Sequence, residues 1–166
     1  MTKLVTDRLV LREAQESDLE ALHDAMRRPE AMRYWSTPEH ETLEETRVWL
    51  QRMLHPPHPS DDFVITLAGR VIGKAGSWKL PEVGYLIHPD YWGKGYATEA
   101  MRAVIAHLFA THDLDRLVAE VDPRNAASLG LLAKLGFVET HREERTMQWR
   151  DEWCDSVYLE LRRPNG

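Results

Sequence analysis

The chain has 166 residues, a formal net charge of −6 and a single cysteine, Cys154. This length predicts one domain, residues 1–166, with a core of ordinary size. The acidic balance argues against broad nucleic-acid binding, and a lone cysteine excludes an internal disulfide framework. No apolar run is long enough to span a membrane, and no signal core opens the chain. We therefore expect a cytoplasmic protein with neither nucleic acid nor membrane as a partner.

The first part of the chain predicts a strand followed by two helices. Leu9–Arg12 is rich in strand-forming residues. Ser17 is typical of a helix N-cap, with Glu20 completing a capping box, and Pro29 suits a helix stop. Thr42 or a neighbour opens the second helix. The buried stripe of that helix comprises Thr46, Trp49, Leu50 and Met53.

The middle of the chain reads as a loop and a hairpin. Residues 55–61 contain three prolines, which deny this loop regular hydrogen bonding. Residues 63–67 and 71–72 flank a turn at 68–70 and predict two antiparallel strands. Gly73 and Gly76 weaken the second strand, as a bulge or as a place where two backbones approach closely.

The second half alternates strands and helices. Strands are expected at 82–87 and 116–121, and helices at 98–110 and 125–135, the latter ended by Gly136. Two closing strands, near 137–148 and 153–161, surround a turn at 150–152. Together the elements predict a mixed α/β layer domain without repeats or linkers.

The loop at residues 92–98 is the most informative stretch. Small residues at a helix start present free backbone N–H groups, and the helix dipole adds partial positive charge, so the loop predicts an anion site suited to phosphate. A dinucleotide-binding motif would need glycine where the chain has Thr98, and it would follow the first strand. The P-loop pattern is absent as well.

Six short motifs resemble the GCN5-related N-acetyltransferases (GNAT), in the branch of the ribosomal-protein N-terminal (alanine/serine) acetyltransferases. They are residues 6–12 (TDRLVLR), 32–35 (MRYW), 82–89 (EVGYLIHP), 92–97 (WGKGYA), 125–128 (NAAS) and 134–137 (KLGF). The resemblance covers nearly the whole chain. It implies an α/β fold whose mostly antiparallel central sheet is splayed between the fourth and fifth strands, those of Ile87 and Val121, with helices on both faces.

The resemblance also implies acetyl-CoA as co-substrate and no metal. Backbone groups of three strand residues would pair with the pantetheine arm, and the loop amides would hold the pyrophosphate. The cofactor-binding residues so implied are Leu86, Ile87, His88, Trp92, Gly93, Lys94, Gly95, Tyr96, Ala97, Thr98, Asn125 and Ser128. One departure is Trp92, where the family usually has Gln or Arg. Since phosphate binding rests on backbone donors, we expect the site to survive it.

Acetyl transfer to an amine needs a base for the amine, donors for the thioester oxygen and an acid for the departing sulfur. In this branch the acid maps to Ser128, which alternatively bonds its own helix backbone. A backbone N–H near Leu86 would serve the oxygen. Glu82 is the first candidate base and Glu120 the second, with a water chain or a plain surface role for Glu82 as alternatives. Asn125 would hold pantetheine, cap its helix, or do both.

Several other residues have weaker functional readings. Tyr34 and Trp35 fall where the branch lines its acceptor pocket, although aromatic pairs often serve packing alone. Trp149 and Trp153 edge the same pocket or pair across strands. A metal reading of His55 and His58 lacks further ligands at a known spacing, and Cys154 lacks a neighbouring base for acyl transfer.

We therefore expect an acetyl-CoA-dependent N-acetyltransferase in which the amine attacks the thioester directly. The acceptor is a primary amine, either a protein N-terminus or a small molecule, and the net charge favours a cationic one. The protein would be a monomer or a homodimer. The alternative is a non-catalytic acyl-CoA sensor with the same fold.

Overall fold

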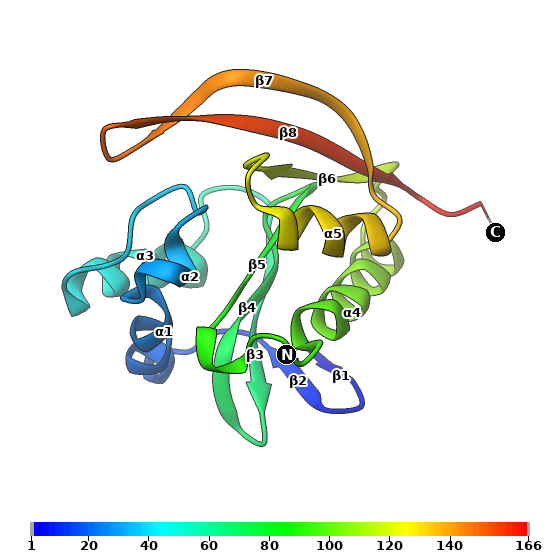
Figure 1. The fold of residues 1–166 in the computed structure, drawn as a ribbon. Coiled ribbons are helices and arrows are strands. Elements are labelled where there is room, and N and C mark those ends of the chain that lie inside the picture. The colour runs from blue at the N-terminus through cyan, green and yellow to red at the C-terminus, as the bar shows by residue number, and fades with distance from the viewer. Residues whose placement is uncertain (1, 166) are drawn as a thin grey trace.

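The structure is a computed structural model that describes residues 2–165. It contains one eight-stranded sheet with the order β1-β2-β3-β4-β5-β6-β8-β7. The strands are β1 (Lys3–Val5), β2 (Leu9–Arg12), β3 (Asp61–Leu67), β4 (Arg70–Lys79), β5 (Glu82–Ile87), β6 (Arg116–Val121), β7 (Val138–Trp149) and β8 (Glu152–Arg162). The helices are α1 (Leu19–Met26), α2 (Pro29–Met32), α3 (Leu43–Leu54), α4 (Tyr96–Thr111) and α5 (Ala126–Lys134). Figure 1 shows α1, α2 and α3 on one side of the sheet and α4 and α5 on the other.

The pairing of β5 with β6 is the one parallel pairing among the described strands. The two strands are in register at a single position, Glu82 opposite Val118, and the Val118 N–H donates to the carbonyl of Pro81 at 3.1 Å. Beyond this point β5 and β6 separate, so the sheet is splayed between the strands that hold Ile87 and Val121, as predicted.

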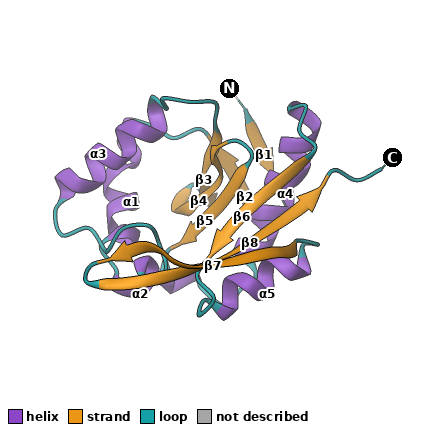
Figure 2. Ribbon diagram, turned by 90° about the horizontal axis from the view of Figure 1, so that it is seen from above, coloured by secondary structure: helices purple, strands orange, loops and turns teal. Residues whose placement is uncertain are grey.

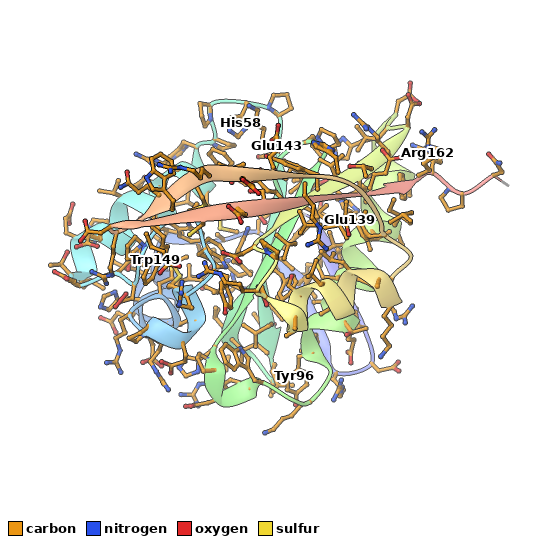
Figure 3. All side chains as sticks on the ribbon, turned by 45° about the horizontal axis from the view of Figure 1, so that its top comes forward. His58, Tyr96, Glu139, Glu143, Trp149 and Arg162 are labelled. Atoms are coloured by element: carbon orange, nitrogen blue, oxygen red, sulfur yellow. The ribbon has the colours of Figure 1, made fainter. Side chains whose placement is uncertain are left out.

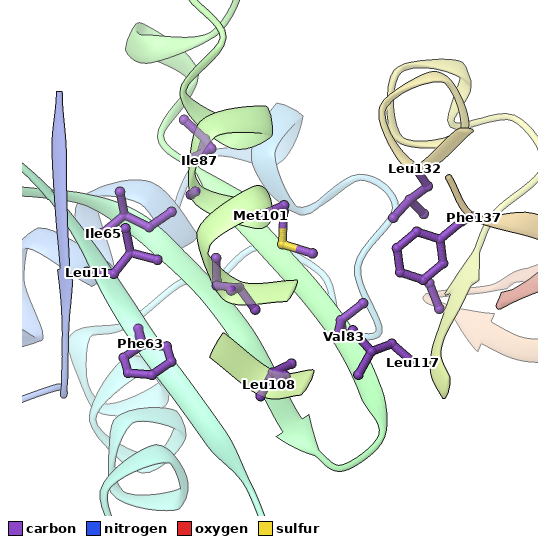
Figure 4. Packing of buried hydrophobic residues seen from close by; sticks show 14 of the residues in the cluster. Leu11, Phe63, Ile65, Val83, Ile87, Met101, Leu108, Leu117, Leu132 and Phe137 are labelled. Carbon is purple, nitrogen blue, oxygen red and sulfur yellow. The ribbon is translucent and has the colours of Figure 1, made fainter. Parts of the chain in front are cut away.

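The side chains of β5 alternate between two cores. Val83 and Ile87 belong to the main core under α4 and α5, together with Met101 and Leu108 (Figure 4). Leu86 faces the other way and packs with residues of α1 and α2. Figure 2, seen from above, shows the two helical layers that cover these faces. Successive side chains of β5 therefore serve opposite sides of the sheet.

Most predicted elements are confirmed, and three details of the N-terminal part differ. Strand β1 was not predicted. Ser17 does not cap α1: the chain first forms a 3₁₀ turn, Glu16–Asp18, in which Asp18 accepts from the Gln15 N–H at 2.8 Å. Asp18 is held in this position because its carboxylate also accepts hydrogen bonds from both terminal nitrogens of Arg12. Pro29 follows the end of α1 but also opens α2, since its fixed φ suits a first helical position.

Other end signals are confirmed. The Thr42 side chain accepts from the Glu45 N–H at 3.2 Å and caps α3. Gly136, with φ of 100°, follows α5 in the left-handed conformation. Helix α4 begins two residues earlier than predicted, because Gly95 adopts φ of 82° and acts as its N-cap. None of the described helices is both long and apolar enough to cross a membrane.

At Gly73 the backbone of β4 passes close to that of β5. A Cβ added to Gly73 would lie 2.0 Å from the Leu86 carbonyl oxygen, whereas one added to Gly84 would meet nothing within 4 Å. We predict that Gly73→Ala destabilises the fold by about 1–3 kcal/mol through overpacking, and that Gly84→Ala changes stability by less than about 1 kcal/mol. Urea unfolding of both variants measures this difference, and equal midpoints would contradict the close approach.

Candidate functional site

The loop between β5 and α4 is built to expose backbone donors. Gly93 and Gly95 adopt φ of 75° and 82°, which other residues rarely do. The first helical bond of α4 runs from the Glu99 N–H to the Gly95 carbonyl at 3.1 Å. The N–H groups of Tyr96, Ala97 and Thr98 therefore have no acceptor within the helix. Together with the helix dipole they provide donors and partial positive charge of the kind that suits an anion.

Trp92 ties this loop to the end of β5. Its indole Nε1–H donates to the Ile87 carbonyl at 2.8 Å, and the side chain is about half exposed. Like the Gln or Arg usual at this position in the family that the sequence resembles, Trp92 has a side-chain N–H, so a hydrogen-bond donor is kept at the start of the loop. The His88 ring is buried nearby, accepts from the Asp90 N–H at 3.1 Å, and contacts Asp24 through Nε2 at 2.8 Å.

The hydrogen-bonding groups of the β5 backbone point in two directions. Some face β4, and the others face the gap between the diverging strands β5 and β6, which we call the splay. The His88 N–H donates to Ile72 at 2.8 Å, and the β4–β5 register runs unbroken from Gly84 to Ile87. Because hydrogen-bonded and non-hydrogen-bonded pairs alternate in an antiparallel ladder, Leu86 bonds towards β4, as His88 does. The N–H and C=O groups of Tyr85 and the N–H of Ile87 point into the splay instead, and the Ile87 carbonyl accepts from Trp92.

Ser128 and Tyr85 lie together on the α4 and α5 side of the splay. Asn125 Oδ1 accepts from the Ser128 N–H at 3.2 Å, so Asn125 caps α5 as the alternative reading predicted. The Ser128 side chain is buried. Burial raises the pKa of Tyr85, and a hydrogen bond with Ser128 opposes that shift. Tyr85 was not predicted as a site residue. The alternation of side chains along β5 nevertheless places it on the same face as Val83 and Ile87, the face covered by α4 and α5.

A cavity of about 160 Å³ opens on the opposite face of the sheet. It brings together Glu82, Glu120, Tyr34 and Trp35, four residues that the sequence analysis had selected from three separate segments. Side chains alternate between the two faces of a strand, so Glu82 lies on the same face as Leu86 and on the opposite face from Val83. Trp149 and the buried Cys154 also line the cavity. Figure 3 shows Trp149 below the end of the β7–β8 hairpin, well away from Tyr96 at the start of α4.

The charge of Glu120 acts on Glu82 within the cavity. Desolvation by the surrounding protein, and then the negative charge of Glu120, raise the pKa of Glu82, while Lys79 opposes the shift. Glu82 keeps contact with solvent, so the raised pKa belongs to a carboxylate at the cavity wall and not to a sealed one. Glu120 is fixed by the Ser156 hydroxyl, which donates to it at 3.0 Å and is itself 2.5 Å from Thr146 Oγ1.

The end of the β7–β8 hairpin forms the outer wall of the cavity. Trp149 Nε1–H donates to the Met32 carbonyl at 3.2 Å, and Glu152 pairs with Arg33 at 3.2 Å and with Arg124. The Arg33 guanidinium lies 5.0 Å from the Trp149 ring centre. These contacts pin the hairpin to the segment after α2. No local sequence pattern predicts them, because the contacts of Met32 and Arg33 join residues more than a hundred positions apart and that of Arg124 joins residues 28 positions apart.

Two residues with weaker functional readings, Trp153 and His58, lie outside this arrangement. Trp153 is exposed and does not line the cavity. The guanidinium carbon of Arg145 lies 4.8 Å from the centre of the Trp153 ring. His58 packs edge-on against Trp78. Within residues 2–165 no group of three His, Cys, Asp or Glu side chains is arranged to hold a metal ion.

Comparison with known proteins agrees with this geometry. Residues 8–138 match the acetyltransferase (GNAT) domain family. The chain is 31% identical to the uncharacterized N-acetyltransferase YoaA of Bacillus subtilis, over 81% of each chain. It is 27% identical to the ribosomal protein uS5 alanine N-acetyltransferase of Escherichia coli, over 98% of this chain and 92% of that one.

A similar fold occurs in the spermidine N-acetyltransferase of Vibrio cholerae, solved with CoA and spermine. The TM-score is 0.79 at 20% identity, over 93% of this chain and 95% of that one. The family match spans most of the chain, including the donor loop, the splay and most of the acidic cavity. The chain belongs to the acetyltransferase (GNAT) family.

Proposed function

We propose that the chain transfers the acetyl group of acetyl-CoA to a cationic primary amine by direct attack within a ternary complex. One observation carries this proposal: the donor loop with Ser128 and the acidic cavity with Glu82 open on opposite faces of the same splay. Two substrates could meet there through the sheet. A sensor would need the loop alone, whereas this chain also has a polar acceptor cavity.

Acetyl-CoA, when bound, supplies the thioester. The amides of residues 92–98 would hold its pyrophosphate. The Ile87 N–H and the Tyr85 carbonyl, which face the splay, would pair with the pantetheine arm as with an added strand. Because the Leu86 N–H is turned towards β4, and because the thioester is the end of the arm farthest from the pyrophosphate, we assign the donor for the thioester oxygen to the Tyr85 N–H. Preorganised backbone donors of this kind are well suited to stabilise developing negative charge.

Glu82 would act as the base for the acceptor amine. Its raised pKa brings a carboxylate closer to the operating range of general bases. Glu120, immobilised by Ser156, would attract the ammonium form of the acceptor. Ser128, or Tyr85 beside it, would donate a proton to the departing sulfur. Burial holds Tyr85 in its neutral, proton-bearing form.

The cavity limits the reacting end of the acceptor. At about 160 Å³ it is comparable to an engineered protein cavity of roughly 150 Å³ that binds benzene. It can therefore hold one small side chain or an alkyl amine, and a small diamine or a flexible protein N-terminus would both fit. Spermidine and ribosomal-protein acetyltransferases among the relatives represent these two acceptor classes.

We predict that Glu82→Gln lowers kcat by roughly 100-fold or more, because a positioned base is lost. Release of free thiol from acetyl-CoA, measured with a panel of polyamines, amino acids and N-terminal peptides, provides the assay. Glu139→Gln, an exposed change on β7, is the matched control and should leave kcat unchanged. If the wild-type protein binds acetyl-CoA but none of the acceptors causes thiol release, the proposal that the chain is an enzyme is contradicted.

We predict that Glu120→Gln moves the acidic limb of the kcat–pH profile to lower pH. The charge of Glu120 raises the pKa of Glu82, so removing that charge lowers it, and Glu82 then stays deprotonated further into acid. Activity in both proteins falls as pH drops through the pKa of Glu82. An unshifted limb in Glu120→Gln would exclude Glu82 as the titrating base.

We predict that Ser128→Ala and Tyr85→Phe affect kcat unequally. Removing the hydroxyl that protonates the departing sulfur should lower kcat by roughly 100-fold or more, and removing the other hydroxyl should change kcat little. Acetyl thioesters whose thiol leaves more easily identify which hydroxyl is the acid, because they restore the rate only in the variant that lacks it. Near wild-type kcat in both variants would show that solvent supplies the proton.

A further inference from the structure

The turn between β1 and β2 is fastened to the first turn of α4. Thr6 Oγ1 donates to Glu99 Oε2 at 2.5 Å, and the Arg8 N–H donates to the same oxygen at 2.9 Å. Arg8 Nε donates to Glu99 Oε1 at 2.7 Å. Burial alone would raise the pKa of Glu99, but these hydrogen bonds lower it below its ordinary value. Glu99 is thus held as a carboxylate at the start of α4.

Arg8 also contacts two residues of the donor loop, Lys94 and Tyr96, and lies close to Gly95 between them. Its Nη1 donates to the Lys94 carbonyl at 2.9 Å, and its guanidinium carbon lies 4.4 Å from the Tyr96 ring centre. Its Nη2 would lie 3.4 Å from a Cβ placed on Gly95. We call Arg8 and its partners Glu99 and Lys94 the Arg8 latch. The latch joins two segments about 90 positions apart in the sequence.

The latch acts on the loop in two ways. The carbonyl and N–H of one trans peptide point in opposite directions, so a Lys94 carbonyl fixed on Arg8 also fixes the direction of the Gly95 N–H. A carboxylate in the first turn favours the helix dipole but repels an anion bound at the same end. The guanidinium neutralises Glu99 and leaves the dipole free to attract phosphate.

We propose that Arg8 is a positioning residue for the phosphate groups of acetyl-CoA, acting through the conformation of the donor loop and the charge of Glu99. This inference rests on the proposed function, because it concerns the same cofactor. It makes the β1–β2 turn a functional part of the site, although that turn contributes nothing to the acceptor cavity.

The test compares Arg8→Ala with wild-type protein by calorimetric binding of CoA and by turnover with two donors. S-acetylpantetheine carries the thioester but no phosphate. We expect Arg8→Ala to weaken CoA binding about tenfold, as loss of a charge-assisted contact does. The KM for acetyl-CoA should rise by a similar factor at unchanged kcat, and kcat/KM for S-acetylpantetheine should stay the same. The turn should stay folded, because Thr6 and the Arg8 N–H still bind Glu99.

Two controls sharpen the result. Arg102→Ala removes the same charge from the exposed side of α4 and should leave CoA binding unchanged. The double variant Arg8→Ala/Glu99→Gln should recover part of the lost affinity, because the unneutralised carboxylate is gone. Equal CoA binding by wild-type and Arg8→Ala proteins would overturn the inference, as would equal losses with both donors. Failure of the wild-type protein to bind CoA would instead contradict the proposed function.

Discussion

The short parallel pairing between β5 and β6 governs the structure of this site. The strands share one register position, Glu82 with Val118, and then diverge. A parallel pair that continued would saturate the backbone of Tyr85 and Ile87 and close the sheet. Because it stops, the Tyr85 N–H and C=O and the Ile87 N–H face the gap between the two strands and not a neighbouring strand, while the Ile87 carbonyl accepts from Trp92.

The alternation of side chains along β5 assigns different chemistry to each face. Tyr85 lies beside Ser128 on one side, and Glu82 lies with Glu120 in the cavity on the other. The proposed acid and the proposed base therefore lie on opposite faces of the sheet. The same strand packs Val83 and Ile87 into the main core, so the groups proposed to act in catalysis sit on a rigid element.

The sequence predicted the parts of the fold and site that depend on local patterns. Thr42, Asn125 and Gly136 are end signals read from neighbouring residues, and the donor loop follows from its glycines. The cavity residues Tyr34, Trp35, Glu82 and Glu120 were found by resemblance to the family. Long-range contacts were not predictable: the Arg8–Glu99 pair and the Glu152 contacts join distant segments and leave no periodic pattern. Ser17 failed as a cap because Arg12 recruits Asp18, a tertiary contact that local propensity does not include.

Hydrogen–deuterium exchange of single amides, with and without CoA, tests the central claim most directly. If the cofactor enters the splay as an added strand, the Ile87 amide becomes protected on binding, together with amides of residues 95–98. The Leu86 amide, already bonded towards β4, serves as an internal reference and should be slow in both states. Protection confined to the loop, with Ile87 exchanging at the same rate in both states, would contradict the account, because the splay would then not be the cofactor channel.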